Sequence, residues 1–135
     1  MTDDLAAFLA ARLDEDEAAA KMATKFPHWH AQPWYDGQFL KDGRTERADL
    51  WGRPGMQFTG QGALDTVVAD HIARHDPARV LREVAAGRAL LADYLQAIDD
   101  YAEFDVIRIN HLKRAVKWRA AVYSDHPDYR QEWAP

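Results

Sequence analysis

The sequence predicts a mainly α-helical fold, a bundle of about four helices with a small β-hairpin inserted between the first and second helices. Apolar residues recur at helical spacing in residues 2–26 and again from residue 63 onward. The segment between them, 27–62, holds six of the seven glycines and three of the five tryptophans. Glycine-rich turns between aromatic residues are typical of hairpins rather than helices.

Two of the predicted helices have clear sequence signals at their ends. Thr2 is a plausible N-cap for the first helix, and Pro27 ends it. The pair Asp76-Pro77 is a strong start signal for the third helix. The predicted helices cover residues 2–26, 63–75, 77–100 and 104–123, and a short turn covers 127–133.

Composition restricts the class of protein. The chain has 135 residues, which suits one domain over 1–135. Because it has no cysteine, disulfides, thiol nucleophiles and Cys-ligated zinc are excluded. A net charge of -5 argues against general nucleic-acid binding. No apolar run approaches the ~20 residues of a membrane span, and the start lacks the basic region of a signal peptide, so we expect a cytoplasmic location.

Helical periodicity also predicts which faces point inward. A glycine, Gly87, lies on the buried stripe of the third helix, where we expect a close helix crossing. The predicted inward residues of the other helices are Leu5, Phe8, Leu9 and Leu13 in the first, Leu64, Val67, Val68 and Ile72 in the second, and Ile107, Ala115, Trp118 and Val122 in the fourth.

Five ionisable residues fall on these predicted apolar faces: Arg12, Asp16, His71, His75 and His111. We favour a buried structural network, because buried charges are costly unless they are paired. The alternative is a metal-dependent hydrolase-like enzyme that uses His71 and His75, one turn apart, with Asp16, since that histidine spacing suits a divalent ion. A third interpretation is an Asp–His general base. No catalytic motif or other cofactor signal is present.

Two surface features are candidates for partner binding. A thin hairpin can bury few large aromatic side chains, yet the predicted hairpin segment contains Trp29, Trp34 and Trp51. Any of them that remain exposed would form a binding hot spot. The outer face of the fourth helix forms a basic strip, which makes a nucleic-acid binder the third candidate function. Its residues are Arg108, Lys113, Arg114, Lys117 and Arg119.

Three sequence blocks, 3–17, 71–84 and 123–133, resemble one uncharacterised family. They begin with Asp3-Asp4-Leu5, His71-Ile72-Ala73 and Tyr123-Ser124-Asp125. The family is the actinobacterial and actinophage family catalogued as domain of unknown function number 6221. The resemblance implies a cytoplasmic protein of an actinobacterium or its bacteriophage, and it implies no activity or functional residues. We therefore predict a small non-enzymatic protein-interaction or accessory protein, with host interaction as its role if phage-borne.

Overall fold

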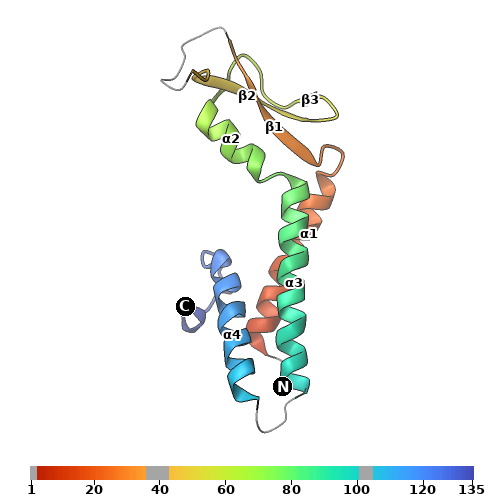
Figure 1. Ribbon diagram of the computed structural model, residues 1–135, viewed down its shortest axis with the longest axis vertical. Coiled ribbons are helices and arrows are strands. Elements are labelled where there is room, and N and C mark those ends of the chain that lie inside the picture. The colour runs from red at the N-terminus through yellow and green to blue at the C-terminus, as the bar shows by residue number, and fades with distance from the viewer. Residues whose placement is uncertain (1–2, 36–42, 101–104) are drawn as a thin grey trace. The chain divides into compact units, whose positions relative to one another are not determined.

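The computed structural model describes residues 3–35, 43–100 and 105–135. It confirms the predicted fold class, because the chain is mainly helical, with four helices and a small antiparallel sheet that lies in chain order between the first and the second helix (Figure 1). The helices are α1 (Asp4–Met22), α2 (Thr66–Arg74), α3 (Pro77–Asp99) and α4 (Val106–Ala120), and short 3-10 turns follow at Ala121–Tyr123 and Gln131–Trp133. The strands are β1 (His28–Pro33), β2 (Arg47–Arg53), β3 (Met56–Gln57) and β4 (Leu64–Asp65).

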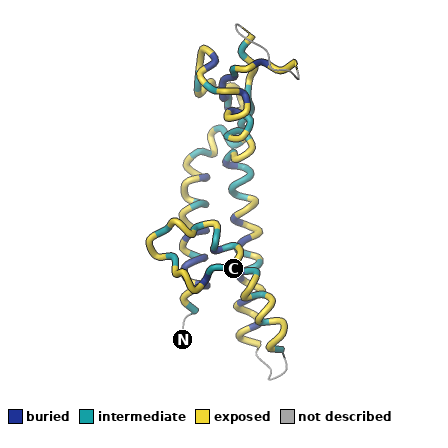
Figure 2. The backbone as a smooth tube through the Cα atoms, turned by 90° about the vertical axis from the view of Figure 1, so that its left-hand side faces the viewer, coloured by how far each residue is buried: buried dark blue, intermediate teal, exposed yellow. Residues whose placement is uncertain are grey.

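The chain forms two compact units, each defined by the contacts among its own residues. Unit 1 comprises residues 1–18 and 82–135, and unit 2 comprises residues 19–81. Each unit has buried residues of its own, and buried positions alternate with exposed ones along the helices (Figure 2). Within the described ranges, none of the helices combines the length and apolar character needed to cross a membrane.

Unit 1 is a bundle of three helical segments: all of α4, residues 4–18 of α1 and residues 82–99 of α3. Its core consists of apolar side chains from all three helices and one tryptophan from the C-terminal segment. These residues are Leu5, Phe8, Leu9, Leu13, Val84, Leu91, Tyr94, Ala97, Val116, Ala120 and Trp133. The inward stripe predicted for the first helix is therefore correct.

The start of α1 depends on one aspartate. Oδ1 of Asp3 accepts hydrogen bonds from the backbone N–H groups of Leu5 (3.0 Å) and Ala6 (3.1 Å), and thus caps the helix. Oδ2 of Asp3 accepts a hydrogen bond from the hydroxyl of buried Tyr94 at 2.5 Å. Burial alone would raise the pKa of Asp3, but these hydrogen bonds and the charge of Lys113 outweigh it and lower the pKa. The predicted cap, Thr2, lies outside the described residues.

Unit 2 is built around strand β2. This strand pairs antiparallel with β1 on one side and with both β3 and β4 on the other, so that Trp29 faces Gly52 and Leu64 faces Ala48. Helix α2 packs on β1 and β2. The predicted turns at Asp36-Gly37 and Lys41-Asp42 lie outside the described residues.

The boundaries of two predicted helices are set by aspartates. Asp76 caps α3 as predicted, because its Oδ1 accepts from the backbone N–H of Arg79 at 2.8 Å. Its Oδ2 also accepts from the backbone N–H of Trp29 at 3.3 Å and so ties β1 to the helix start. The second helix begins later than predicted, since Leu64 and Asp65 form β4 and Asp65 has the extended backbone of an N-cap.

Gly87 lies at a close contact between α3 and α1, as its position on the stripe predicts. A Cβ atom at Gly87 would lie 2.9 Å from Cδ2 of Leu13 and 3.3 Å from Nε of Arg119. Leu13 is fully buried and has little room to move. Glycine at this position thus sets how closely these helices approach.

We predict that Gly87→Val lowers the free energy of unfolding by about 2 kcal/mol, because the added methyl groups overpack the contact with Leu13. The matched control is Ala86→Val on the exposed side of the same helix, which we expect to cost under about 1 kcal/mol. Urea unfolding of both variants measures the difference. Equal losses would contradict a close crossing at Gly87.

Candidate functional site

The three histidines of the predicted polar cluster are exposed. His71 and His75 lie one turn apart on α2, with ring centroids 4.6 Å apart, and Nδ1 of His75 donates to the carbonyl oxygen of His71 at 2.8 Å. His111 is exposed on α4. The prediction that these histidines lie on buried faces is wrong, because α2 and α4 pack through their opposite faces.

Arg12 and Asp16 do lie within unit 1, and each has a partner from the C-terminal segment. Arg12 is buried, its Nη1 lies 2.7 Å from Nδ1 of His126, and its Nη2 donates to Oε1 of Glu15 at 2.8 Å. Oδ2 of half-buried Asp16 accepts from the hydroxyl of Tyr123 at 2.5 Å. The sequence analysis missed both His126 and Tyr123, whose only signal was their position in the third family-like block.

No metal centre is evident in the residues that the structure describes. Within 3–35, 43–100 and 105–135, no group of three or more His, Asp or Glu residues is arranged to hold a metal ion. His71 and His75 therefore have each other as neighbours but no third ligand from the described part of the chain. Asp16 already accepts the Tyr123 hydrogen bond.

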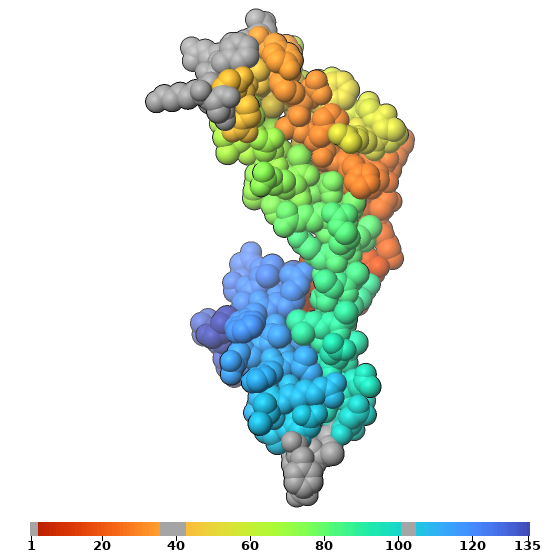
Figure 3. Space-filling view, viewed as in Figure 1, coloured from red at the N-terminus to blue at the C-terminus, as the bar shows by residue number. Residues whose placement is uncertain are grey.

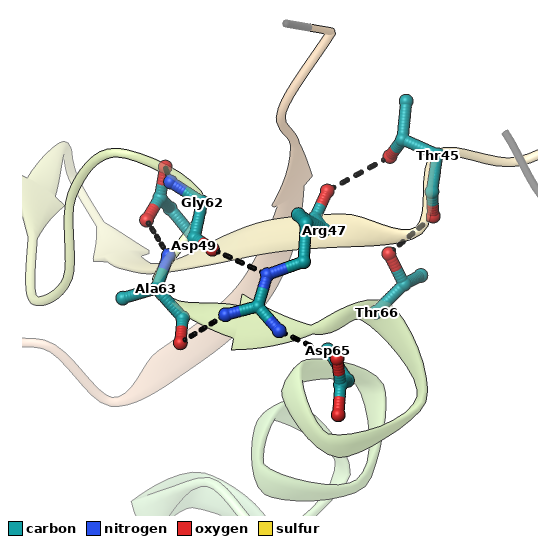
Figure 4. A network of polar contacts seen from close by, with 7 residues as sticks. All are labelled: Thr45, Arg47, Asp49, Gly62, Ala63, Asp65 and Thr66. Carbon is teal, nitrogen blue, oxygen red and sulfur yellow. Dashed lines mark hydrogen bonds and ion pairs between the residues drawn. The ribbon is translucent and has the colours of Figure 1, made fainter. Parts of the chain in front are cut away.

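A buried carboxylate organises the loop that leads into α2 (Figure 4). Asp49 on β2 is 4% exposed. Its Oδ1 accepts from the hydroxyl of Thr59 (3.1 Å) and the N–H of Ala63 (3.3 Å), and its Oδ2 accepts from the N–H of Gly62 (3.1 Å). These donors occupy the carboxylate, so Asp49 is a structural group.

Arg47, on the same strand, binds the other side of this loop. Its Nε donates to the carbonyl of Gly62 and its Nη2 to the carbonyl of Ala63, both at 2.8 Å, while Nη1 meets Oδ1 of Asp65 at 2.6 Å. Gly62 has a φ of 63°, which favours glycine. Together Asp49 and Arg47 hold both the donors and the acceptors of one loop, as Figure 4 shows.

The three tryptophans predicted to bind a partner are half-buried. Nε1 of Trp29 donates to the carbonyl of Phe26 at 2.7 Å, and its ring packs edge-to-face against Phe58 at 5.6 Å. Trp34 covers Gly62, where a Cβ atom would lie 2.7 Å from the indole ring. Trp51 lies on the central strand β2. At least two of these rings therefore have packing partners within unit 2.

Three apolar side chains predicted to face inward point into solvent: Ile107 and Trp118 on α4, and Val122 in the 3-10 turn that follows it. Ile107 is 72% exposed, Trp118 56% and Val122 64%, whereas Val116 and Ala120 are fully buried. The buried side of α4 is therefore the one that carries Val116 and Ala120, with Ile109 and Leu112 half-buried. The surface of residues 105–135 is drawn in blue in Figure 3.

Helix α2 repeats this arrangement. Val67 and Val68 are 65% and 45% exposed, while Thr66 and Ala69 face the sheet. Thr66 donates its hydroxyl to the carbonyl of Thr45 at 2.5 Å, so a polar residue occupies the packed side of the helix. The predicted inward orientation of Val67 and Val68 is therefore wrong as well.

The comparisons with known proteins give a family and no function. The model described as Family of unknown function (DUF6221) matches residues 2–135, so the chain belongs to this family. The resemblance read from the sequence is thereby confirmed. No curated protein and no solved structure matches the chain.

We predict that Asp49→Asn lowers the free energy of unfolding by about 2 kcal/mol. The asparagine amide would place its own N–H groups against buried N–H and O–H donors, which then lose a hydrogen-bond acceptor. Asp65→Asn is the control. Asp65 also binds Arg47, but its side chain is 61% exposed, and we expect a cost below about 0.5 kcal/mol. Chemical denaturation measures both, and similar losses would contradict the role of Asp49.

The Tyr123–Asp16 hydrogen bond predicts a loss of stability in alkali. Burial and this hydrogen bond raise the pKa of Tyr123 to about 12. Because this value lies above the ordinary pKa of 10.0, the folded state holds the phenolic proton more tightly. The contribution is fully present below about pH 10 and disappears as the pH rises through about 12.

We therefore expect the stability difference between the wild type and Tyr123→Phe to shrink across this range in urea titrations. The matched control is Tyr35→Phe, the same substitution at a side chain that is 69% exposed. A Tyr123→Phe difference that stays constant up to about pH 12 would refute the prediction.

Proposed function

We propose that this member of the DUF6221 family is a small non-enzymatic protein-interaction module whose contact surface is the outward face of α4. The observation that carries the proposal is the apolar stripe of Ile107, Trp118 and Val122, three large side chains that are more than half exposed. We name this surface, together with the intervening His111 and Arg114, the α4 stripe.

The members of the α4 stripe are aligned rather than scattered. At about 100° per residue, Ile107 and Trp118 fall within about 20° of one another on α4, on the side opposite Val116, and exposed Val122 follows in the 3-10 turn after the helix. They span roughly 22 Å of helix, since each residue adds about 1.5 Å. Isolated exposed apolar residues are ordinary, but an aligned set on one helix is typical of a surface that another protein covers.

The composition of the stripe also suits protein binding. Trp118 is a large, rigid side chain, and tryptophan is enriched among residues that dominate binding energy. Arginine is enriched in the same way, and Arg114 lies in the stripe. The outward valines of α2 are a smaller apolar surface of the same kind and supply a comparison within the same chain.

Affinity capture from a lysate of the native host cell, with matched variants, tests this proposal. The double variant Ile107→Ser/Trp118→Ser should reduce recovery of the specific partner at least tenfold relative to the wild type, because hot-spot residues contribute about 2 kcal/mol or more each. The control, Val67→Ser/Val68→Ser on α2, should retain the partner. Both variants remove exposed side chains, and circular dichroism verifies that each remains folded.

Two results would overturn the proposal. One is that the wild type recovers no specific partner. The other is that the α4 double variant recovers the same partner at the same yield as the wild type, which would place the contact elsewhere on the chain.

A further inference from the structure

We infer that the α4 stripe binds an acidic amphipathic helix of a partner protein. This inference rests on the proposed function and adds the chemistry of the partner. It depends on two observations, the charge of α4 and a basic groove beside Trp118.

The charge of the α4 region is opposite to that of the whole chain. The sequence carries a net charge of -5, yet residues 106–124 contain no Asp or Glu and five basic residues: Arg108, Lys113, Arg114, Lys117 and Arg119. Arg108 meets Asp105 at 3.6 Å, and Arg119 is half-buried with its guanidinium over the ring of Tyr123. The cations offered to a partner therefore lie on the side of the stripe that carries Lys113, Arg114 and Lys117, where a partner that covers the apolar residues would bring its carboxylates.

A groove next to Trp118 collects three of these cations. It has a volume of about 320 Å³ and is lined by Asn110, Lys113, Arg114, Lys117 and Trp118, with the last residues of the chain closing one side. Nζ of Lys117 donates to the carbonyl of Glu132 at 3.0 Å, which fixes its position at the groove.

The groove is suited to a carboxylate on an apolar helix. Within the described ranges, Lys113 and Arg114 form no ion pair with a carboxylate, although the charge of Lys113 acts on Asp3. Ammonium and guanidinium groups bind carboxylates by charge-assisted hydrogen bonds, and the indole of Trp118 supplies an apolar wall at the same place. An Asp or Glu side chain in the groove, next to an apolar side chain over Trp118, would satisfy both.

The same charges disfavour two other occupants. A second copy of the chain docked through its own α4 would bring two sets of five cations together, which costs free energy. A nucleic acid would meet the cations with its phosphates, but would leave Ile107 and Val122 without apolar partners. The acidic helix is the occupant that uses both the cations and the apolar residues.

Fluorescence anisotropy with defined probes tests the inference. The probe is a labelled, helix-forming peptide of about 16 residues, with leucines along one face and glutamates directly flanking that face. The matched probe has lysine in place of each glutamate, and a short DNA duplex is the third. We expect the wild type to bind the glutamate peptide at least tenfold more tightly than the lysine peptide, with affinity falling as salt rises.

Variants locate the binding. Lys113→Glu/Arg114→Glu and, separately, Trp118→Ser should each weaken glutamate-peptide binding at least fivefold. The control is Arg53→Glu, which reverses an exposed cation of unit 2 and should leave binding unchanged. Equal affinity for the two peptides, no binding of either, or tighter binding of the duplex with the same dependence on the variants would overturn the inference.

The two experiments separate the two proposals. If the glutamate peptide fails while lysate capture still depends on Ile107 and Trp118, the α4 stripe remains a protein-binding surface and only the acidic partner is refuted. If lysate capture does not depend on α4, the proposed function itself fails.

Discussion

Close packing around small side chains is the constraint on which the architecture of unit 1 depends. Gly87 leaves no space between its own helix and Leu13, and Val116 and Ala120 give α4 a flat packed side. Small residues allow helix backbones to approach closely, but they cannot by themselves enclose large apolar side chains. Ile107 and Trp118 lie on the side of α4 opposite Val116 and Ala120, and with Val122 in the following turn they form the exposed α4 stripe.

The ionisable groups of the interior are engaged in holding chain segments together. Asp3 joins the start of α1 to Tyr94, Asp16 joins α1 to Tyr123, Asp49 holds the loop before α2, and Asp76 joins the start of α3 to β1. Each carboxylate accepts from N–H or O–H donors, which offset the cost of burying charge. These four carboxylates therefore have structural roles.

The sequence was sufficient to predict the fold class, the inward stripe of α1, the Asp76-Pro77 start and the glycine crossing, because each depends on local periodicity or a cap. It could not predict the orientation of α2 and α4. Periodicity identifies the apolar side of a helix, whereas the side that packs depends on how closely a distant helix or sheet approaches. His71, His75 and His111 were misplaced by the same error, since they share the apolar sides that face outward.

The cations around the α4 stripe have two physical effects that act together. Their charges keep an exposed apolar stripe compatible with water, since long basic side chains cover apolar surface with their stems and keep their charged ends hydrated. The same charges on another copy would repel them, which disfavours self-association through this face. In the proposed complex, a partner surface with an apolar centre and carboxylates near Lys113, Arg114 and Lys117 would match both features of the stripe. The cations that hydrate the stripe would then also select the partner.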